Sequence, residues 1–292
     1  MQRDGKVLPV GLMVLAIILF WYIMAVVLNT PWQKDVYQRA EQTNVGMLQH
    51  IKDTWAQERP VLPSPHQVAT EIWNTTVEKK ITSKRSLIYH AKITLSSSML
   101  GFALGTVLGI LLAVAIVYNQ ALNKSLLPWI IASQTIPILA IAPMIIVVLN
   151  AIGVQGLLPK AFISMYLSFF PIVVGMVKGL TSPDTSHLDL LHTYNASATQ
   201  SFWKLRLPSS LPYLFTSMKV AVAISLVGAI VAELPTGAVA GLGARLLAGS
   251  YYGQTIQIWS ALIVASVLAA LLVTLIGLLG RFINHRMGLT HG

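Results

Sequence analysis

Six long runs of apolar residues, each almost free of charge, alternate with short segments that carry most of the Lys, Arg, Asp and Glu. A helix needs about 20 apolar residues to cross the hydrocarbon core of a membrane, and each run is long enough. Only 10% of the residues are charged, whereas soluble domains carry about 25%. The runs cover residues 8–28, 93–118, 126–149, 158–177, 211–234 and 256–283. The sequence therefore predicts an all-α, polytopic membrane protein with about six transmembrane helices.

Basic residues flank both ends of the chain and set the expected orientation. Arg3 and Lys6 precede the first run, while Arg281 and Arg286 lie at the end of the last. Cytoplasmic loops collect Lys and Arg, and six spans return the chain to its starting side, so we expect both termini in the cytoplasm. The first run is longer than the apolar core of a cleaved secretory signal, which has about 7–15 residues. We therefore interpret it as an uncleaved anchor.

The net charge of +10 is explained by the Lys and Arg that collect in the cytoplasmic loops of membrane proteins. No basic cluster is interleaved with aromatic residues, so we expect no nucleic-acid partner. Cysteine is absent, which excludes disulfides, thiolate metal sites and thiol catalysis. The partner that composition itself indicates is the lipid bilayer.

The spacing of the runs divides the chain into three predicted parts. Residues 1–30 hold an N-terminal tail and the first transmembrane helix. Residues 31–90 form a segment outside the membrane, expected in the periplasm, and residues 91–287 form a core of five transmembrane helices. The core contains one long polar loop, residues 182–209, on the cytoplasmic side.

Two helices are expected in the segment between the first two runs. Residues 34–57 favour a helix that Pro60 ends. A second helix is predicted over residues 66–79, because Ser64 is available as its cap and Pro65 fits the first helical position.

Gly101, Gly105 and Gly109 recur at every fourth position of the second run. This spacing places the three glycines on one face of a helix, where the missing side chains let another backbone approach closely. The neighbour is expected to be either another helix of the same bundle or a second subunit.

Prolines interrupt the third and fourth runs. Such breaks are tolerated at membrane depth only where protein or a water-filled cavity surrounds them. Gln134 and Thr135 come shortly before Pro137, deep in the third run. These three residues, together with Glu233 at the end of the fifth run, are candidates for a solute pathway. Gln134 and Thr135 could equally form hydrogen bonds between helices.

Ionisable residues are almost absent from the interiors of the runs, and no His occurs within any of them. An ion-coupled carrier usually needs such groups at membrane depth to bind the coupling ion. The chain also lacks a G-x-x-x-x-G-K-[ST] phosphate loop. Uphill transport would therefore need energy from another protein. We expect the chain to be no enzyme and to have no catalytic residue, cofactor site or metal site of its own.

The longest polar loop reads SPDTSHLDLLHTYNASATQSFWKLRLPSSLPYL from Ser182 onward. Ser182 can cap a helix that has Pro183 at its first position, and this helix is predicted to run to Tyr194. Asn195 comes next, and Asn tolerates the left-handed conformation that ends many helices.

A second, shorter helix is predicted after this turn. Ser197 and Gln200 form an S-x-x-Q capping box that opens it, and Pro208 is expected to stop it. Large apolar side chains on a cytosolic loop indicate that a protein partner or the membrane surface covers them. The apolar face of this helix consists of Phe202, Trp203 and Leu205.

The loop resembles that of the permease family of ATP-binding-cassette importers, in the branch that handles nitrate, sulfonates, taurine and thiamine-precursor-like solutes. That family carries E-A-A-x-x-x-G, then nine residues, then I-x-L-P. With Leu207 and Pro208 aligned on the last two letters, the spacing is kept: Leu205 takes the Ile position, Asn195 the Gly position and Asp189 the Glu position. The chain departs from the pattern with Asp for Glu, two Leu for the Ala pair, and Asn for Gly.

Three further stretches resemble the family in the same order along the chain. They are Leu62-Pro-Ser-Pro65 before Val68, Ile136-Pro137 with Ala142-Pro143, and Ala232-Glu233 before Gly241-Leu242-Gly243. The likeness extends over about residues 62–287, and residues 29–60 have no counterpart in it.

The resemblance implies a type I importer permease of MetI-like architecture in a bacterial inner membrane. Two copies, expected as a homodimer, would form the pathway, and a cytoplasmic dimer of ATPase subunits would bind ATP and Mg²⁺. A periplasmic binding protein would deliver a small polar solute, such as a pyrimidine, a vitamin precursor, a sulfonate or nitrate. The loop would transmit the motion of the ATPase to the spans. The residues expected to couple the two are Asp189, Asn195, Ser197, Phe202, Trp203, Leu205, Leu207 and Pro208.

Two other classes of function remain open on the residues alone. One is a secondary carrier or channel that acts without an ATPase, which the lack of ionisable groups at depth disfavours. The other is a membrane scaffold that recruits a soluble partner through the same loop, which the order of the motifs disfavours.

Overall fold

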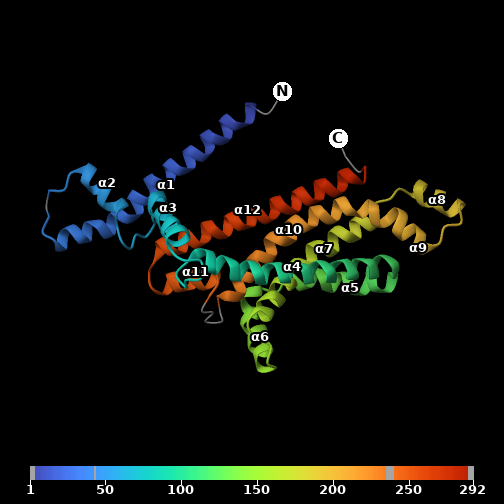
Figure 1. Cartoon of the computed structure of the whole chain (residues 1–292). Helices are drawn as coiled ribbons and strands as arrows, with labels where there is room; N and C mark the ends of the chain where they lie inside the picture. The colour runs from blue at the N-terminus through green and yellow to red at the C-terminus, as the bar shows by residue number, and fades with distance from the viewer. Residues whose placement is uncertain (1–3, 43, 235–239, 289–292) are drawn as a thin grey trace. The chain divides into compact units, whose positions relative to one another are not determined.

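The computed structural model describes residues 4–42, 44–234 and 240–288, with side chains from Leu8 onward. Within those residues the chain consists of helices and short connections, without a β-strand (Figure 1). Five helices are long and apolar enough to cross a membrane, and a bent helix pair raises the number to six if it counts as one span. The chain divides into two compact units, which are residues 1–90 with 245–264, and residues 91–244 with 265–292.

The first unit begins with a long helix that extends beyond the predicted first span. The apolar run continues as helix to Arg39, and Glu41 then adopts a left-handed conformation with φ 54°. The hydrogen bond from the Gln42 N–H to the Tyr37 carbonyl, at 3.0 Å, then satisfies a carbonyl at the end of the helix. The single helix predicted over residues 34–57 is therefore wrong, because this turn divides it. The helices are α1 (Asp4–Arg39), α2 (Met47–Trp55) and α3 (Pro65–Trp73), which a π-helical turn (Asn74–Glu78) extends.

Buried polar side chains fasten α2 onto α1. The Asn29 side chain, which is fully buried, donates to the carbonyls of Thr54 and Leu62 and accepts from the Leu62 N–H. The Gln57 amide donates to the Gln33 side chain at 2.8 Å. We call α1 from Leu19 onward, with the turn and α2, the α1–α2 hairpin. The start of α3 follows the prediction, because Pro65 opens it and the Gln67 side chain accepts from the Ser64 N–H at 3.0 Å.

The second unit contains the remaining candidate spans. They pack around α7, which contributes Phe169, Ile172, Val173 and Met176 to the apolar core. Helix α11 (Leu242–Tyr251) and the start of α12 lead from one unit to the other. The helices are α4 (Leu87–Tyr118), α5 (Gln120–Ser133), α6 (Ile138–Ala151), α7 (Leu157–Leu180), α8 (Thr185–Thr193), α9 (Ala198–Ser201), α10 (Leu207–Glu233) and α12 (Thr255–Arg286).

The third predicted span is not a straight helix. It consists of α5 and α6, which are bent by 100° at the break between Ser133 and Ile138. Pro137 has no N–H to donate to the carbonyl of Ser133, four residues earlier. That carbonyl instead accepts the hydroxyl of Tyr166, from α7. A freed carbonyl at membrane depth is thus satisfied within the protein, as such a break requires.

The three glycines of α4 lie directly against α7. A Cβ at Gly101 would lie 2.3 Å from the Cβ of Ser164, and one at Gly105 would lie 2.3 Å from the Oγ of Ser168. One at Gly109 would meet Ile172 at 2.7 Å. These positions leave no room for a side chain, so the backbones of α4 and α7 pack at close range within one chain.

Candidate functional site

The polar loop between α7 and α10 is anchored at its base. The Arg206 guanidinium donates to the carbonyl of Leu180, the last residue of α7, at 2.9 Å. A cation at a helix C-terminus is favourable, because it meets unsatisfied carbonyls and the negative end of the helix dipole. Asp184 occupies the cap position of α8, in an extended conformation. The prediction of Ser182 as the cap is therefore wrong, and its hydroxyl donates back to the carbonyl of Gly179.

Asn195 makes the sharp turn between the two short helices of the loop. Its φ is 51°, in the left-handed region that the sequence predicted. The Asn195 N–H donates to the His192 carbonyl, and the Ala196 N–H donates to the Leu191 carbonyl. This pair of bonds is the Schellman arrangement, which satisfies carbonyls at the end of a helix.

The second short helix opens with the predicted capping box. Ser197 accepts from the Gln200 N–H at 3.3 Å, while the Gln200 side chain accepts from the Ser197 N–H at 2.9 Å. Beyond Ser201 the helix widens into a π-helical turn, Phe202–Arg206, and continues into α10.

Pro208 does not stop this helix, contrary to the prediction. The Leu207 N–H donates to the carbonyl of Phe202, five residues earlier. Because the π-helical turn shifts the hydrogen-bond frame, Pro208 lies in the first turn of α10, where its missing N–H is not needed. The second short helix of the loop and α10 thus form one continuous helix, from Ala198 to Glu233.

The predicted apolar face of the loop is divided between the inside and the outside of the unit. Phe202 packs on Tyr118 at the end of α4, with ring centroids 5.9 Å apart, and Leu207 joins the same core. Trp203 is 62% exposed and Leu205 half-buried. Tyr194 is 78% exposed. Asp189, Leu190, Tyr194 and Trp203 are among the exposed residues of the loop.

Close backbone packing joins α7 and α10 above the loop. A Cβ at Gly175 would lie 2.5 Å from Ser217, and one at Gly179 would lie 2.8 Å from Ser210. At the far end of the pair, a Cβ at Gly228 would meet the backbone of Ser164 at 2.9 Å. Small residues thus keep the two helices in contact along their length.

Glu233, at the end of α10, is the centre of a buried polar cluster. Its side chain has no exposed surface. The Thr94 hydroxyl lies 2.9 and 3.0 Å from the two carboxylate oxygens, and the Gly243 N–H donates at 2.9 Å. The Lys160 ammonium is 3.8 Å away and also donates to a backbone carbonyl. The cluster therefore ties α4, α7 and α10 to the backbone at the start of α11.

The same carboxylate explains the glycines that follow it. A Cβ at Gly241 would lie 2.1 Å from the carboxyl carbon of Glu233, and one at Gly243 would lie 2.3 Å from a carbonyl of α10. Gly241 also has a φ of 128°, which disfavours other residues. The sequence pointed to Glu233 and this glycine pair through the family motif. It gave no sign of Thr94 or Lys160, because they come from distant helices.

The other pathway candidates lie at the bend between α5 and α6. The Gln134 side chain donates to the Ser133 hydroxyl, and the Thr135 hydroxyl donates to the Ala132 carbonyl. Both bonds are local to the end of α5. Thr135 and Pro137 are exposed, whereas Glu233 is enclosed. The four candidates therefore do not share one surface.

The second unit also contains a groove of about 670 Å³ between α7 and α10. Its walls are mostly apolar, with the hydroxyls of Thr216 and Ser217 bonded to carbonyls of their own helix. The Lys178 ammonium lies 6.0 Å above the ring of Tyr213 at the end near the loop.

Comparison with known proteins identifies the family to which a chain with these spans and this loop belongs. Residues 105–289 match the family described as the binding-protein-dependent transport system inner membrane component. The chain belongs to this family, the permease subunits of ATP-binding-cassette importers, and it is a multi-pass membrane protein.

Individual relatives fall in the branch that the loop motif predicted. The chain is 35% identical to the formylaminopyrimidine transport permease protein ThiX of Halalkalibacterium halodurans, over 63% of this chain and 68% of the relative. It is 29% identical to a probable ABC transporter permease protein of Haemophilus influenzae, over 76% and 86% of the two chains. It is 30% identical to the riboflavin transport system permease protein RibX of Chloroflexus aurantiacus, over 76% and 79%.

Proposed function

We propose that this chain is the membrane-spanning subunit of an ATP-driven importer, and that its loop between α7 and α10 receives the motion of a separate ATPase. The observation that carries the proposal is the geometry of the loop. Two short helices meet at the left-handed Asn195 and leave Tyr194 and Trp203 exposed. The loop occupies the position at which the family motif lies.

Rigid connections make this loop suited to transmit force. Arg206 fixes its base to the end of α7. The helix that starts at Ala198 runs without interruption into α10. Glycines and serines hold α7 and α10 at backbone contact, and Gly101 to Gly109 hold α4 against α7. A tilt of the loop would then rotate these helices as a body, which is how two-state transporters alternate access.

The partners follow from the family. A second copy of this permease would complete the pathway, a cytoplasmic ATPase dimer would hold ATP and Mg²⁺, and a binding protein would deliver the solute. The basic residues near both ends of the chain and in the loop support a cytoplasmic location for them.

A small nitrogen heterocycle, such as a pyrimidine, is the proposed solute. The names of two relatives refer to formylaminopyrimidine and to riboflavin. The apolar runs have almost no ionisable groups at depth, which favours such a solute over nitrate or a sulfonate. Gln134, Thr135 and Pro137 are proposed to line the pathway. Glu233, whose carboxylate is enclosed, would shape its wall from behind.

The test uses the turn at Asn195. Proline cannot adopt φ near 51°, so Asn195→Pro should disrupt the turn between α8 and α9. In the complex reconstituted with its ATPase and binding protein, we expect this variant to lose solute-stimulated ATP hydrolysis while its insertion into the membrane is unchanged.

Asn195→Gly is the matched control, because glycine adopts the same turn without strain. It should retain stimulated hydrolysis. Normal stimulation in Asn195→Pro would contradict the role of the loop. Accumulation of solute by the chain alone, without an ATPase, would contradict the importer itself.

A further inference from the structure

Two adjoining grooves run along the α1–α2 hairpin, and Met47 lines both of them. Their volumes are about 650 and 760 Å³. The hairpin lies before residue 105, where the match to the transport family begins. Whatever the grooves bind is therefore separate from the proposed coupling function.

The first groove is apolar. Leu19, Ile23 and Val26 of α1 form one wall, and Ile51 and Trp55 of α2 form the other. The α1 residues belong to the candidate membrane span, which is almost entirely exposed on the protein. The groove thus lies on a helix that is long and apolar enough to cross a membrane, and a hydrocarbon chain is what it can accommodate.

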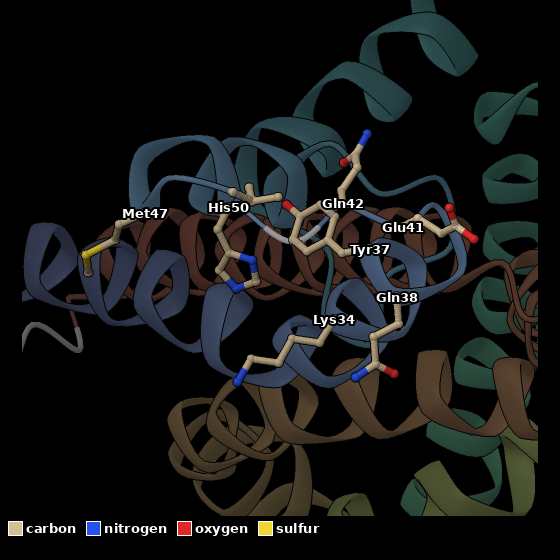
Figure 2. Close-up of a pocket in the computed structure, with 8 residues that line it drawn as sticks. Lys34, Tyr37, Gln38, Glu41, Gln42, Met47 and His50 are labelled. Carbon is tan, nitrogen blue, oxygen red and sulfur yellow. The ribbon is translucent and has the colours of Figure 1, made fainter.

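The second groove has polar as well as apolar lining groups, with a cation and an anion among them (Figure 2), and we call it the polar groove. Lys34 of α1 and Glu41 of the turn after it line the groove, together with the amides of Gln38 and Gln42 and the ring of His50. A cation, an anion and several amide groups suit a ligand that itself has both charges.

The order of the grooves along α1 matches the order of groups across a bilayer leaflet. The apolar groove lies beside residues 19–27, within the apolar run, and the polar groove lies beside residues 34–42, past its end. We propose that the hairpin binds one phospholipid with a zwitterionic ethanolamine headgroup. An acyl chain would lie in the apolar groove, the phosphate near Lys34 and the ammonium near Glu41.

The grooves are formed by contacts that do not involve a ligand. The Tyr37 hydroxyl donates to Asp53 at 2.7 Å, and Thr30 lies 3.0 Å from the His50 ring. Together with the buried Asn29, these bonds fix α2 against α1. A preformed site costs little ordering on binding. A soluble anion would leave the apolar groove empty, and an anionic lipid would offer nothing to Glu41.

The test measures lipid retained by the full chain. The purified permease is transferred from nanodiscs of mixed phosphatidylethanolamine, phosphatidylglycerol and phosphatidylcholine into detergent, and bound lipid is counted by native mass spectrometry. We expect about one ethanolamine lipid per chain. Ile23→Trp, which fills the apolar groove, and the double variant Lys34→Ala/Glu41→Ala should each reduce retention about tenfold or more, since several buried methylenes or two charged contacts are lost.

Matched controls lie on the same two helices but outside the grooves. Leu15→Trp places the same ring on an exposed apolar position of α1, and Lys52→Ala removes a charge from the exposed side of α2. Both should retain the lipid. Equal retention of all three lipids, or a loss of retention in the controls that matches the groove variants, would overturn the proposal. So would retention that Ile23→Trp leaves unchanged.

Discussion

The α1–α2 hairpin and the loop between α7 and α10 contain the same type of turn, but the turns lie in different surroundings. In each, a helix ends at a left-handed residue other than glycine, Glu41 in one and Asn195 in the other, and a short helix follows. The same two hydrogen bonds close both helix ends. The surroundings differ. Asn29 and Gln57 are buried and bonded between the two arms of the hairpin, whereas α8 has no buried residue.

The difference teaches that turn chemistry alone does not assign a role to a helix–turn–helix. What matters is where the polar bonds and the large side chains go. The buried polar groups of the hairpin form hydrogen bonds with one another, and these bonds hold its helices together. The loop leaves Tyr194 and Trp203 in solvent, so its stability must depend on its ends and its exposed groups suit a partner.

The largest expected effect comes from Asn29, which holds the hairpin closed. Asn29→Ala removes three buried hydrogen bonds, each worth about 1 kcal/mol, and leaves backbone groups unpaired. We expect a loss of about 3 kcal/mol in the stability of the hairpin. Hydrogen exchange of the α2 amides measures it.

The exposed Lys52 on α2 provides the control, since Lys52→Ala should change the free energy of exchange by less than about 0.5 kcal/mol. If α2 exchanged at the same rate in Asn29→Ala and in the unmodified chain, the hairpin would not depend on its polar network and the comparison would fail.

The next effect concerns Trp203 and the proposed ATPase. Trp203→Ala should leave the unfolding of the permease within about 0.5 kcal/mol of the parent, because the ring is largely exposed. Its affinity for the ATPase should fall by about 2 kcal/mol, or roughly 30-fold, as for an aromatic anchor of an interface. Titration of the reconstituted permease with the ATPase measures this affinity.

Phe202→Ala reverses the pattern and serves as the matched variant. Its ring packs on Tyr118 inside the unit, so the permease should lose stability instead. Should Trp203→Ala destabilise the permease and leave the affinity unchanged, the loop would be a closed element like the hairpin.

The smallest effect compares the two turns directly. A left-handed conformation costs a residue other than glycine about 1 kcal/mol, and Asn tolerates it better than Glu. Glu41→Gly should therefore stabilise its helix end by about 1 kcal/mol, and Asn195→Gly by less. Thermal unfolding of the two purified variants would show whether the order of the gains is as expected, and a larger gain at Asn195 would reverse it.

Much of the fold was predictable because it depends on local chemistry. The apolar runs predicted the spans at positions that the helices occupy, and Asn195 and Ser197 predicted the turn and the cap of the loop. These features follow from side-chain types a few residues apart. The family followed from the same loop.

The features that the sequence did not reveal depend on contacts between distant segments. The bend between α5 and α6 is possible because Tyr166 satisfies the carbonyl that Pro137 frees. Phe202 faces inward because Tyr118 lies beside it. The cluster around Glu233 needs Thr94 and Lys160, and neither carries a local signal. The roles assigned to the loop and pathway residues remain predictions.

The π-helical turn at Phe202–Arg206 also sets the rotation of the loop about the axis of α10. A π turn holds one residue more than the α-helix it interrupts, and one residue corresponds to about 100° of rotation. Removing a single residue there would leave the length and hydropathy of α10 almost unchanged. It would nevertheless turn the exposed edge of the loop by about a quarter of a revolution relative to the face that packs on α7. The direction in which the loop presents Trp203 thus depends on the number of residues in this turn as much as on their types.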